Sequence, residues 1–376
     1  MILTTCCSAA AAGGRAQETD KDLGGKIEEG LGPHGLGIIT IADVSSKRCG
    51  LTACVNRDFE SCGLSPFLNR SCIVTVLMLS TQVPEFPELR KRLLRLAPRH
   101  VVYADDMVAN LPEEVKKQLE DPDSRYNFGW SHGKEKLESG KLDTFKGSFY
   151  ANPVLDVPTT DDVLVSRYPS YCRPNIWPNE NLPELEIAFK ALGKLMMEVG
   201  LMLAHHCDRY VMGQGVGSYE VTVLSRQLPV QGVTRVVCCT ISHDSLGLTC
   251  GLFTKNSVEV PCPDSAAGLY IRTRDNQVVK VVFGEDQLAY QIGETTEILS
   301  RGYLCATPHC VQAPSSENAS NVDRSTFALF MQPDWNEKLK FPSEIPYHQE
   351  LIPPNGTLTF GEYSERLVNK YYQTTT

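Results

Sequence analysis

The chain has 376 residues, with 45 acidic and 36 basic residues and a formal net charge of −9. A barrel with helical additions can reach this length, so we expect one large domain. Because the basic residues form no stripe, the charge pattern disfavours nucleic acid and anionic membranes as partners and leaves small molecules as the favoured class.

The cysteine pattern and the N-terminus bear on the compartment. The fourteen cysteines are scattered without a C-x-x-C pair, which is typical of free thiols in a reducing compartment. Residues 1–12 lack a basic region followed by a long apolar core, and Cys72–Leu79 is too short to span a bilayer. We therefore expect a soluble, cytoplasmic protein that acts as a monomer.

The N-terminal half divides into three parts. Residues 1–34 are small, Gly-rich and then charged, which predicts a disordered leader. Residues 35–82 are expected to hold a first strand, Gly35–Val44, followed by an insertion. Residues 83–222 form the predicted support region, in which apolar residues three and four apart predict helices that brace a sheet. These helices are expected over Glu85–Leu96, Pro112–Glu120 and Leu182–Tyr210.

The remaining part, residues 223–376, is the predicted core. Short apolar strands alternate there with turn residues, a pattern that is typical of an all-β core. Strands are expected over Gly268–Arg272, Val278–Phe283, Leu288–Ile292 and Ser325–Met331, a short strand opened by a glycine turn over Gly302–Gln312, and an amphipathic helix over Gly361–Tyr372.

Two residues in this core could face one cavity. His309 lies in one expected strand and Arg324 directly before another. An imidazole suits a divalent transition metal, and a guanidinium can hold a carboxylate through two parallel hydrogen bonds. The residues alone also allow a surface histidine and an arginine paired with Asp323 or Glu317.

Several motifs, in this order along the chain, resemble the plant branch of the Fe(II)/2-oxoglutarate-dependent oxygenases, a branch similar to isopenicillin N synthase. The likeness covers about residues 83–210 and 245–372, and its motifs are Asn127–Leu137, Gly147–Pro153, Asn175–Pro178, Gly293–Glu294 with Gly302 and His309, and Arg324-x-Thr326. The resemblance implies a mainly β fold with flanking helices (α+β) around a double-stranded β-helix, or jelly-roll, core.

The resemblance also implies a site. His309 would be the distal iron histidine, and Arg324 with the hydroxyl of Thr326 would hold the far carboxylate of 2-oxoglutarate. The implied cofactors are Fe(II) and 2-oxoglutarate, with ascorbate as a further candidate, and the implied activity is oxidation of a small-molecule substrate.

The other two iron ligands are expected as H-x-D on a strand, because residues two apart on a strand face the same way. The matching place instead holds His243 and Asp244 as neighbours, which can bind one metal only if the backbone turns between them. His206-Cys-Asp208 has the H-x-D letters, but it ends the long predicted helix, where two residues span about 200° of rotation. We interpret it as a helix-end polar cluster.

The altered motif suggests a hypothesis about the coding sequence. Codons for Leu224–His243 can be chosen so that a shift of two bases encodes a peptide resembling the family's strand before the iron histidine. Residues 212–244 would then be translated out of frame, and residues 45–82 would be a retained intron, in an aberrant isoform or gene model. Genomic DNA that cannot encode that peptide would contradict this. We therefore expect impaired activity, with a non-catalytic jelly-roll binding protein or a non-functional isoform as alternatives.

Overall fold

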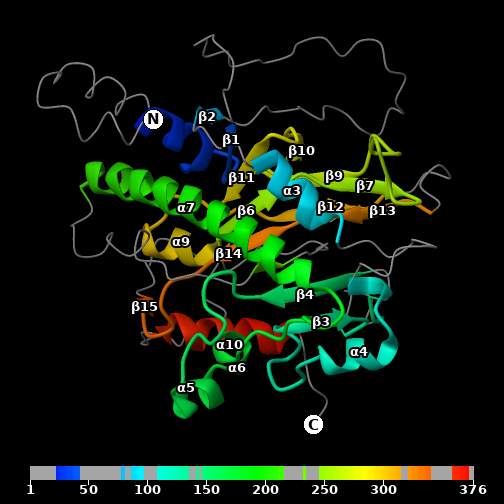
Figure 1. The fold of residues 1–376 in the computed structure, drawn as a ribbon. Helices are drawn as coiled ribbons and strands as arrows, with labels where there is room; N and C mark the ends of the chain where they lie inside the picture. The colour runs from blue at the N-terminus through cyan, green and yellow to red at the C-terminus, as the bar shows by residue number, and fades with distance from the viewer. Residues whose placement is uncertain are drawn as a thin grey trace, which may run out of the picture.

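A computed structural model describes residues 23–42, 78–80, 86–96, 108–134, 141–143, 146–215, 232–233, 245–314, 321–339 and 358–371 (Figure 1). The helices are α3 Phe86–Leu94, the 3-10 helix Val108–Asn110, α4 Glu113–Gln118, α5 Asp162–Arg167, α6 Pro169–Cys172, α7 Pro183–Gly213, α9 Glu294–Leu299 and α10 Phe360–Tyr371. A further helix lies within residues 23–31.

The strands are short and mostly antiparallel. They are β1 Ile38–Ala42, β2 Met78–Ser80, β3 Gly129–His132, β4 Gly147–Ala151, β5 Gly232–Val233, β6 Ser245–Thr249, β7 Leu252–Lys255, β8 Val258–Val260, β9 Gly268–Arg272, β10 Val278–Val281, β11 Gln287–Gln291, β12 His309–Gln312, β13 Asp323–Ser325, β14 Ala328–Met331, β15 Lys338–Leu339 and β16 Leu358–Thr359.

One large sheet organises the described residues. Its strand order is β2-β1-β11-β6-β14-β5-β4-β3, and only the β1–β2 pair is parallel. Two smaller sheets have the orders β10-β9-β12 and β13-β7-β8, and β15 pairs with β16. The chain is therefore a mixed helix and antiparallel-sheet protein.

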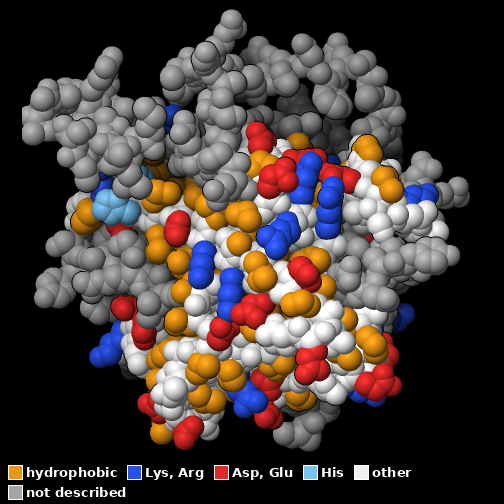
Figure 2. All heavy atoms as spheres, viewed as in Figure 1, with side chains coloured by type: hydrophobic (Ala, Val, Ile, Leu, Met, Phe, Trp, Pro, Cys, Tyr) orange, Lys and Arg blue, Asp and Glu red, His pale blue; other side chains and the backbone are white. Residues whose placement is uncertain are grey.

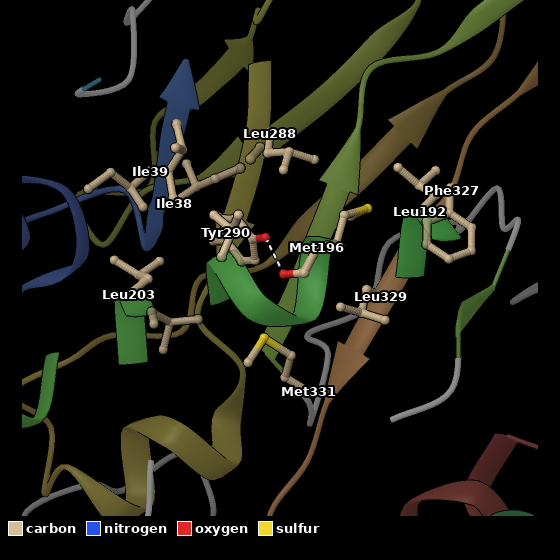
Figure 3. Close-up of a cluster of buried hydrophobic side chains, with 14 of the residues drawn as sticks. Ile38, Ile39, Leu192, Met196, Leu203, Leu288, Tyr290, Phe327, Leu329 and Met331 are labelled. Atoms are coloured by element: carbon tan, nitrogen blue, oxygen red, sulfur yellow. Dashed lines mark hydrogen bonds between the residues drawn. The ribbon is translucent and has the colours of Figure 1, made fainter. Parts of the chain in front are cut away.

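The long helix α7 covers one face of the large sheet (Figure 3). Phe327 meets Phe189 edge to face with ring centroids 5.1 Å apart, and the Tyr290 hydroxyl donates to the Met196 carbonyl at 2.6 Å. A Cβ at Gly200 would lie 2.4 Å from the Met331 sulfur, so only glycine permits this close approach. This apolar layer is the core of the molecule.

A bulge joins the large sheet to one of the small ones. Ala328 pairs with Leu248 in the large sheet, and Ser325 pairs with Leu252 in the small one. Because the Thr249 amide donates to the Phe327 carbonyl, the two residues Cys250 and Gly251 oppose the single residue Thr326. Such a two-against-one bulge bends a strand and redirects its side chains.

Most predicted helices and strands are confirmed to within a few residues. Ser325–Met331 differs because the bulge splits it into β13 and β14. In Gly302–Gln312 the predicted turn at Gly302 is present, and the strand that follows begins only at His309.

The disordered leader predicted over residues 1–34 is wrong at its end. Ile27 and Leu31 are fully buried on the helix within residues 23–31. Apolar residues four apart gave that helix a buried stripe. Among the residues described, no helix is long and apolar enough to cross a membrane.

The two segments interpreted as insertions lie mostly outside the described residues. Of residues 45–82, only β2 is described, and it pairs with β1. Of residues 212–244, the end of α7 with Gln214 and Gly215 is described, as is β5, whose Gly232 and Val233 lie between β14 and β4. This segment thus supplies a strand to the middle of the large sheet.

Candidate functional site

Side-chain alternation places the candidate residues on the face of the sheet opposite α7. Phe327, Leu329 and Met331 point to α7, so residues at even positions of the same strand point the other way. The even positions include Arg324 and Thr326. The extra residue of the bulge lies on the neighbouring strand, and residues 326 and 327 connect β13 to β14.

Arg324 is a cation without a carboxylate partner among the described residues. Its Nη1 atom is buried and has no hydrogen-bond partner. Burial lowers the pKa of the guanidinium, and the nearby Cys262 and Cys250 thiols only partly counteract this shift, although an arginine in a protein stays protonated. A buried, unpaired guanidinium nitrogen is costly and rare. The alternative of an ion pair with Asp323 is therefore wrong, and Glu317 lies outside the described residues.

The bulge leaves room for the Arg324 side chain. A Cβ at Gly251 would lie 2.9 Å from the Arg324 Nε atom, closer than real Cβ contacts come. Glycine at this position therefore lets the guanidinium stem lie against the backbone. Cys250, beside it, is half-buried, and desolvation raises the pKa of its thiol, so it lies near Arg324 as a neutral group.

Arg90 of α3 holds the other side of the same bulge. Its side chain is almost completely buried, and it donates to the Cys250 carbonyl at 3.3 Å and to the Gly251 carbonyl at 3.2 Å. A third contact reaches Glu285 at 3.5 Å. Backbone carbonyls that a bulge removes from the strand ladder need other donors, and Arg90 supplies them.

Thr326 is tied to the neighbouring strand. Its hydroxyl donates to the Thr249 carbonyl at 3.0 Å, and the Thr249 hydroxyl lies 3.5 Å from it. The Thr326 oxygen keeps lone pairs in this arrangement, but its proton is already used. To donate to a ligand carboxylate, as the sequence resemblance implies, the hydroxyl has to exchange this bond for one to the ligand.

His309 lies on β12 in the sheet β10-β9-β12 and is 8% exposed, so the alternative of a surface histidine is wrong. Its Nδ1 atom lies 2.9 Å from Nε2 of Gln291 and 3.1 Å from the Thr307 carbonyl. Gln291 belongs to β11 of the large sheet and alternates with Tyr290, which faces α7. His309 and Gln291 therefore meet between the two sheets, on the side where Arg324 points.

The register of β6 gives the separation, along the strand, of the two backbone positions beside His309 and Thr326. Leu246 pairs with Gln291, the partner of His309, whereas Thr249 contacts Thr326. Three residues along a strand span about 10 Å. A metal–nitrogen bond of about 2 Å and a hydrogen bond of about 2.9 Å fill about half of that span, which leaves room for a short dicarboxylate.

The described residues fit 2-oxoglutarate better than they fit iron. The unpartnered Arg324 Nη1 fits a carboxylate, whereas no group of three His, Cys, Asp or Glu side chains within the described ranges could hold a metal ion. His243 and Asp244 lie outside those ranges, directly before Ser245 of β6. His309 is thus the described residue that can offer iron a ligand.

The His206-Cys-Asp208 sequence lies within α7, which continues to Gly213. Two residues on a helix are about 200° apart, so the two side chains leave the helix in different directions. Asp208 is buried, and His206 is half-buried. The pair therefore does not form the bidentate arrangement that H-x-D makes on a strand.

Sequence reasoning missed Gln291, Arg90 and the bulge. Gln291 is 18 residues from His309, and Arg90 is 160 residues from Cys250. A glutamine on an otherwise apolar strand and an arginine on the apolar face of a helix are buried polar residues in the sequence pattern. That signal could have marked both positions, though not their partners.

No family model matches the sequence, and no curated protein is similar to it in sequence. Solved structures are similar to it in fold. A protein from Caulobacter crescentus assigned to the 2OG-Fe(II) oxygenase family is 17% identical with a TM-score of 0.50, covering 70% of this chain and 82% of its own.

A full-length Neurospora crassa protein is also similar to this chain in fold. Its complex with alpha-KG is 15% identical with a TM-score of 0.50, covering 78% of this chain and 86% of its own. Its complex with alpha-KG and thymine is also 15% identical with a TM-score of 0.50, covering 78% and 87%. The chain therefore shares the fold of these proteins.

Proposed function

We propose that this chain is a 2-oxoglutarate-binding protein of the Fe(II)/2-oxoglutarate-dependent oxygenase family. The observation that carries the proposal is the buried Nη1 atom of Arg324, which has no hydrogen-bond partner. A ligand carboxylate would supply both the missing acceptor and the missing counter-charge. The shared fold, and the separation of about 10 Å along β6 between Leu246, which pairs with Gln291, and Thr249, which contacts Thr326, support the same ligand.

The proposed iron site joins His309 to the His243-Asp244 pair. The strand register supports this site. Leu246 pairs with Gln291, which contacts His309, so the chain enters β6 at the end of the sheet where His309 lies. Bound iron with 2-oxoglutarate supplies the oxidising chemistry, while the protein orients the ligands and excludes water. Adjacent ligands in place of H-x-D make us expect weak or no turnover.

The finer assignments are part of this proposal. The core would be a jelly roll built from residues 223–376, and residues 83–222 would support it. The chain would act as a cytoplasmic monomer on a small molecule, within the plant branch similar to isopenicillin N synthase. Basic and acidic side chains are intermixed on the face seen in Figure 2. Lys91 and Arg95 pair with Glu259, and this mixing of charges does not favour a polyanionic partner.

Anaerobic titration of the purified chain with Fe(II) and 2-oxoglutarate tests the proposal. We expect a visible charge-transfer band from the chelated keto acid, and stabilisation of the fold by the ligand. The band should disappear in His309→Ala, while Ala substitution of the exposed His205 in α7 should leave it unchanged.

Other outcomes identify the alternatives. Stabilisation by 2-oxoglutarate without metal, and no band, would indicate a non-catalytic binding protein. Absence of any ligand response together with a non-cooperative melt would indicate a non-functional isoform.

A further inference from the structure

The contact between Gln291 and His309 has two arrangements with different consequences for the imidazole. A side-chain amide has an oxygen at one end and a nitrogen at the other, in nearly the same shape, so half a turn exchanges them. In the first arrangement Nε2 of Gln291, 2.9 Å away, donates to Nδ1 of His309. The imidazole proton then lies on Nε2 of His309.

The first arrangement leaves two polar atoms poorly placed. Nδ1 of His309 would be an acceptor 3.1 Å from the Thr307 carbonyl, which is also an acceptor. In addition, the buried Oε1 of Gln291 has no hydrogen-bond partner. Buried acceptors without donors are exceptions in folded proteins.

The second arrangement removes the close contact between the two acceptors. With the amide turned, Oε1 of Gln291 faces Nδ1, and a proton on Nδ1 is shared between Oε1 and the Thr307 carbonyl. The closest contact between two acceptors becomes the 3.5 Å separation from the amide to Thr307, instead of 3.1 Å. One unpartnered amide atom remains in either arrangement, because the amide nitrogen takes the former place of Oε1, but the shorter repulsive contact is gone.

The Thr307 carbonyl is held firmly enough to take part. The Thr307 hydroxyl donates to the Leu36 carbonyl at 2.6 Å, and the carbonyl of the next residue, Pro308, accepts from the Arg272 amide at 2.8 Å. The proline also fixes its own backbone angle φ. The acceptor that faces Nδ1 thus belongs to a segment anchored on two sides.

We infer that Gln291 is a positioning residue: with the Thr307 carbonyl it holds His309 in the tautomer whose proton is on Nδ1 and whose lone pair, the one that can bind a metal, is on Nε2. Metal-binding histidines commonly donate their other nitrogen in this way, and removal of the acceptor lowers metal affinity about 10–100-fold. The assignment of the lone pair to a metal rests on the proposed function, whereas the tautomer does not.

The test uses two substitutions at one position. Gln291→Met keeps the length and shape of the side chain but removes the acceptor, whereas Gln291→Glu supplies an oxygen at either end. Gln277→Leu, at an exposed turn, is the control. Nitrogen-15 NMR of the metal-free protein, with the His309 signals assigned through His309→Ala, reports the tautomer, and calorimetry with Co(II) reports metal affinity.

We expect the Nδ1–H tautomer in the unsubstituted protein, in Gln291→Glu and in Gln277→Leu, and a mixture of tautomers in Gln291→Met. Affinity for Co(II) should fall about 10–100-fold in Gln291→Met only. An Nε2–H tautomer in the unsubstituted protein, or an unchanged tautomer in Gln291→Met, would overturn the inference. Failure of the unsubstituted protein to bind Co(II), with the expected tautomers, would overturn the iron proposal and leave the role of Gln291 supported.

Discussion

The two faces of the large sheet differ sharply, although the same strands build both. On the α7 face, Phe327, Leu329 and Met331 pack against α7, and the Tyr290 hydroxyl in this layer is satisfied by the Met196 carbonyl (Figure 3). On the opposite face the intervening positions hold Arg324 and Thr326, and the adjacent β11 presents Gln291 to His309. One strand thus contributes stability through one set of residues and candidate chemistry through the other.

The difference indicates how such a chain can carry a polar site. A buried guanidinium destabilises a fold unless something else compensates, and the apolar layer beneath α7 supplies that compensation. Substitutions on the α7 face should therefore change the free energy of unfolding, whereas substitutions on the other face should change ligand affinity.

The largest effect is expected on the α7 face. Phe327→Ala should lower the free energy of unfolding by about 3–5 kcal/mol, because the ring is fully buried between the sheet and Phe189. Denaturant-induced unfolding measures this change. Phe330→Ala, at a half-buried position of the strand that follows, is the control and should lower the free energy of unfolding by less. Equal losses of unfolding free energy in the two variants would contradict the claim that the α7 face carries the stability of the sheet.

Arg90→Met should have the next largest effect, about 1–3 kcal/mol of stability, because the Cys250 and Gly251 carbonyls lose their donors. The methionine keeps most of the buried stem. Arg92→Met, on the exposed side of the same helix, should change the free energy of unfolding by less than about 0.5 kcal/mol. A similar loss in both variants would show that Arg90 does not support the bulge.

Gly251→Ala should affect affinity more than stability. The added Cβ would meet Nε of Arg324 at 2.9 Å and displace the guanidinium, so we expect about a tenfold weaker affinity for 2-oxoglutarate, equivalent to about 1.4 kcal/mol. Calorimetric titration measures it. Gly213→Ala, where nothing lies within 4 Å of the new Cβ, provides the comparison. An unchanged affinity in Gly251→Ala would place the ligand elsewhere.

The smallest effect is expected beside α7, where Asp156 pairs with Lys190 at 2.6 Å. Although desolvation opposes the shift, hydrogen bonds from Lys190, Trp177 and Asn175 lower the pKa of Asp156 to about 2. The stabilisation is therefore complete above the unfolded pKa of about 3.9 and is lost as the pH falls toward 2.

Because the Asp156 side chain is 50% exposed, solvent screening limits its contribution to less than about 1 kcal/mol. Stability measured between about pH 5 and pH 2 should therefore fall slightly more steeply in the unsubstituted protein than in Asp156→Asn. Identical slopes would show that the pair contributes nothing.

The sequence predicted the secondary structure well because apolar periodicity is a local property. The strand over Ser325–Met331 was predicted as continuous, since nothing local to it reports a bulge on the neighbouring strand. The leader was mispredicted because a short helix beside glycines resembles disorder until Ile27 and Leu31 find their core. Short-range patterns thus predicted the helices and strands but not the bulge that joins two of the sheets.

The candidate site was predicted only in part, for a similar reason. Motif order marked His309, Arg324 and Thr326, and alternation now gives Arg324 and Thr326 the same face. The contacts that surround them come from distant segments, such as Arg90 on α3 and Gln291 on β11, which no spacing rule connects. His243 and Asp244 lie outside the described residues, so their role stays a prediction.

The most direct test of the account is calorimetric titration of the metal-free protein with 2-oxoglutarate, comparing Arg324→Met with Arg272→Met, an arginine exposed on β9. We predict that Arg324→Met weakens binding about 10–100-fold, the loss expected for a hydrogen bond to a charged group, while Arg272→Met binds as the unsubstituted protein does. Equal affinities in all three proteins would contradict the claim that the face opposite α7 binds the dicarboxylate through Arg324.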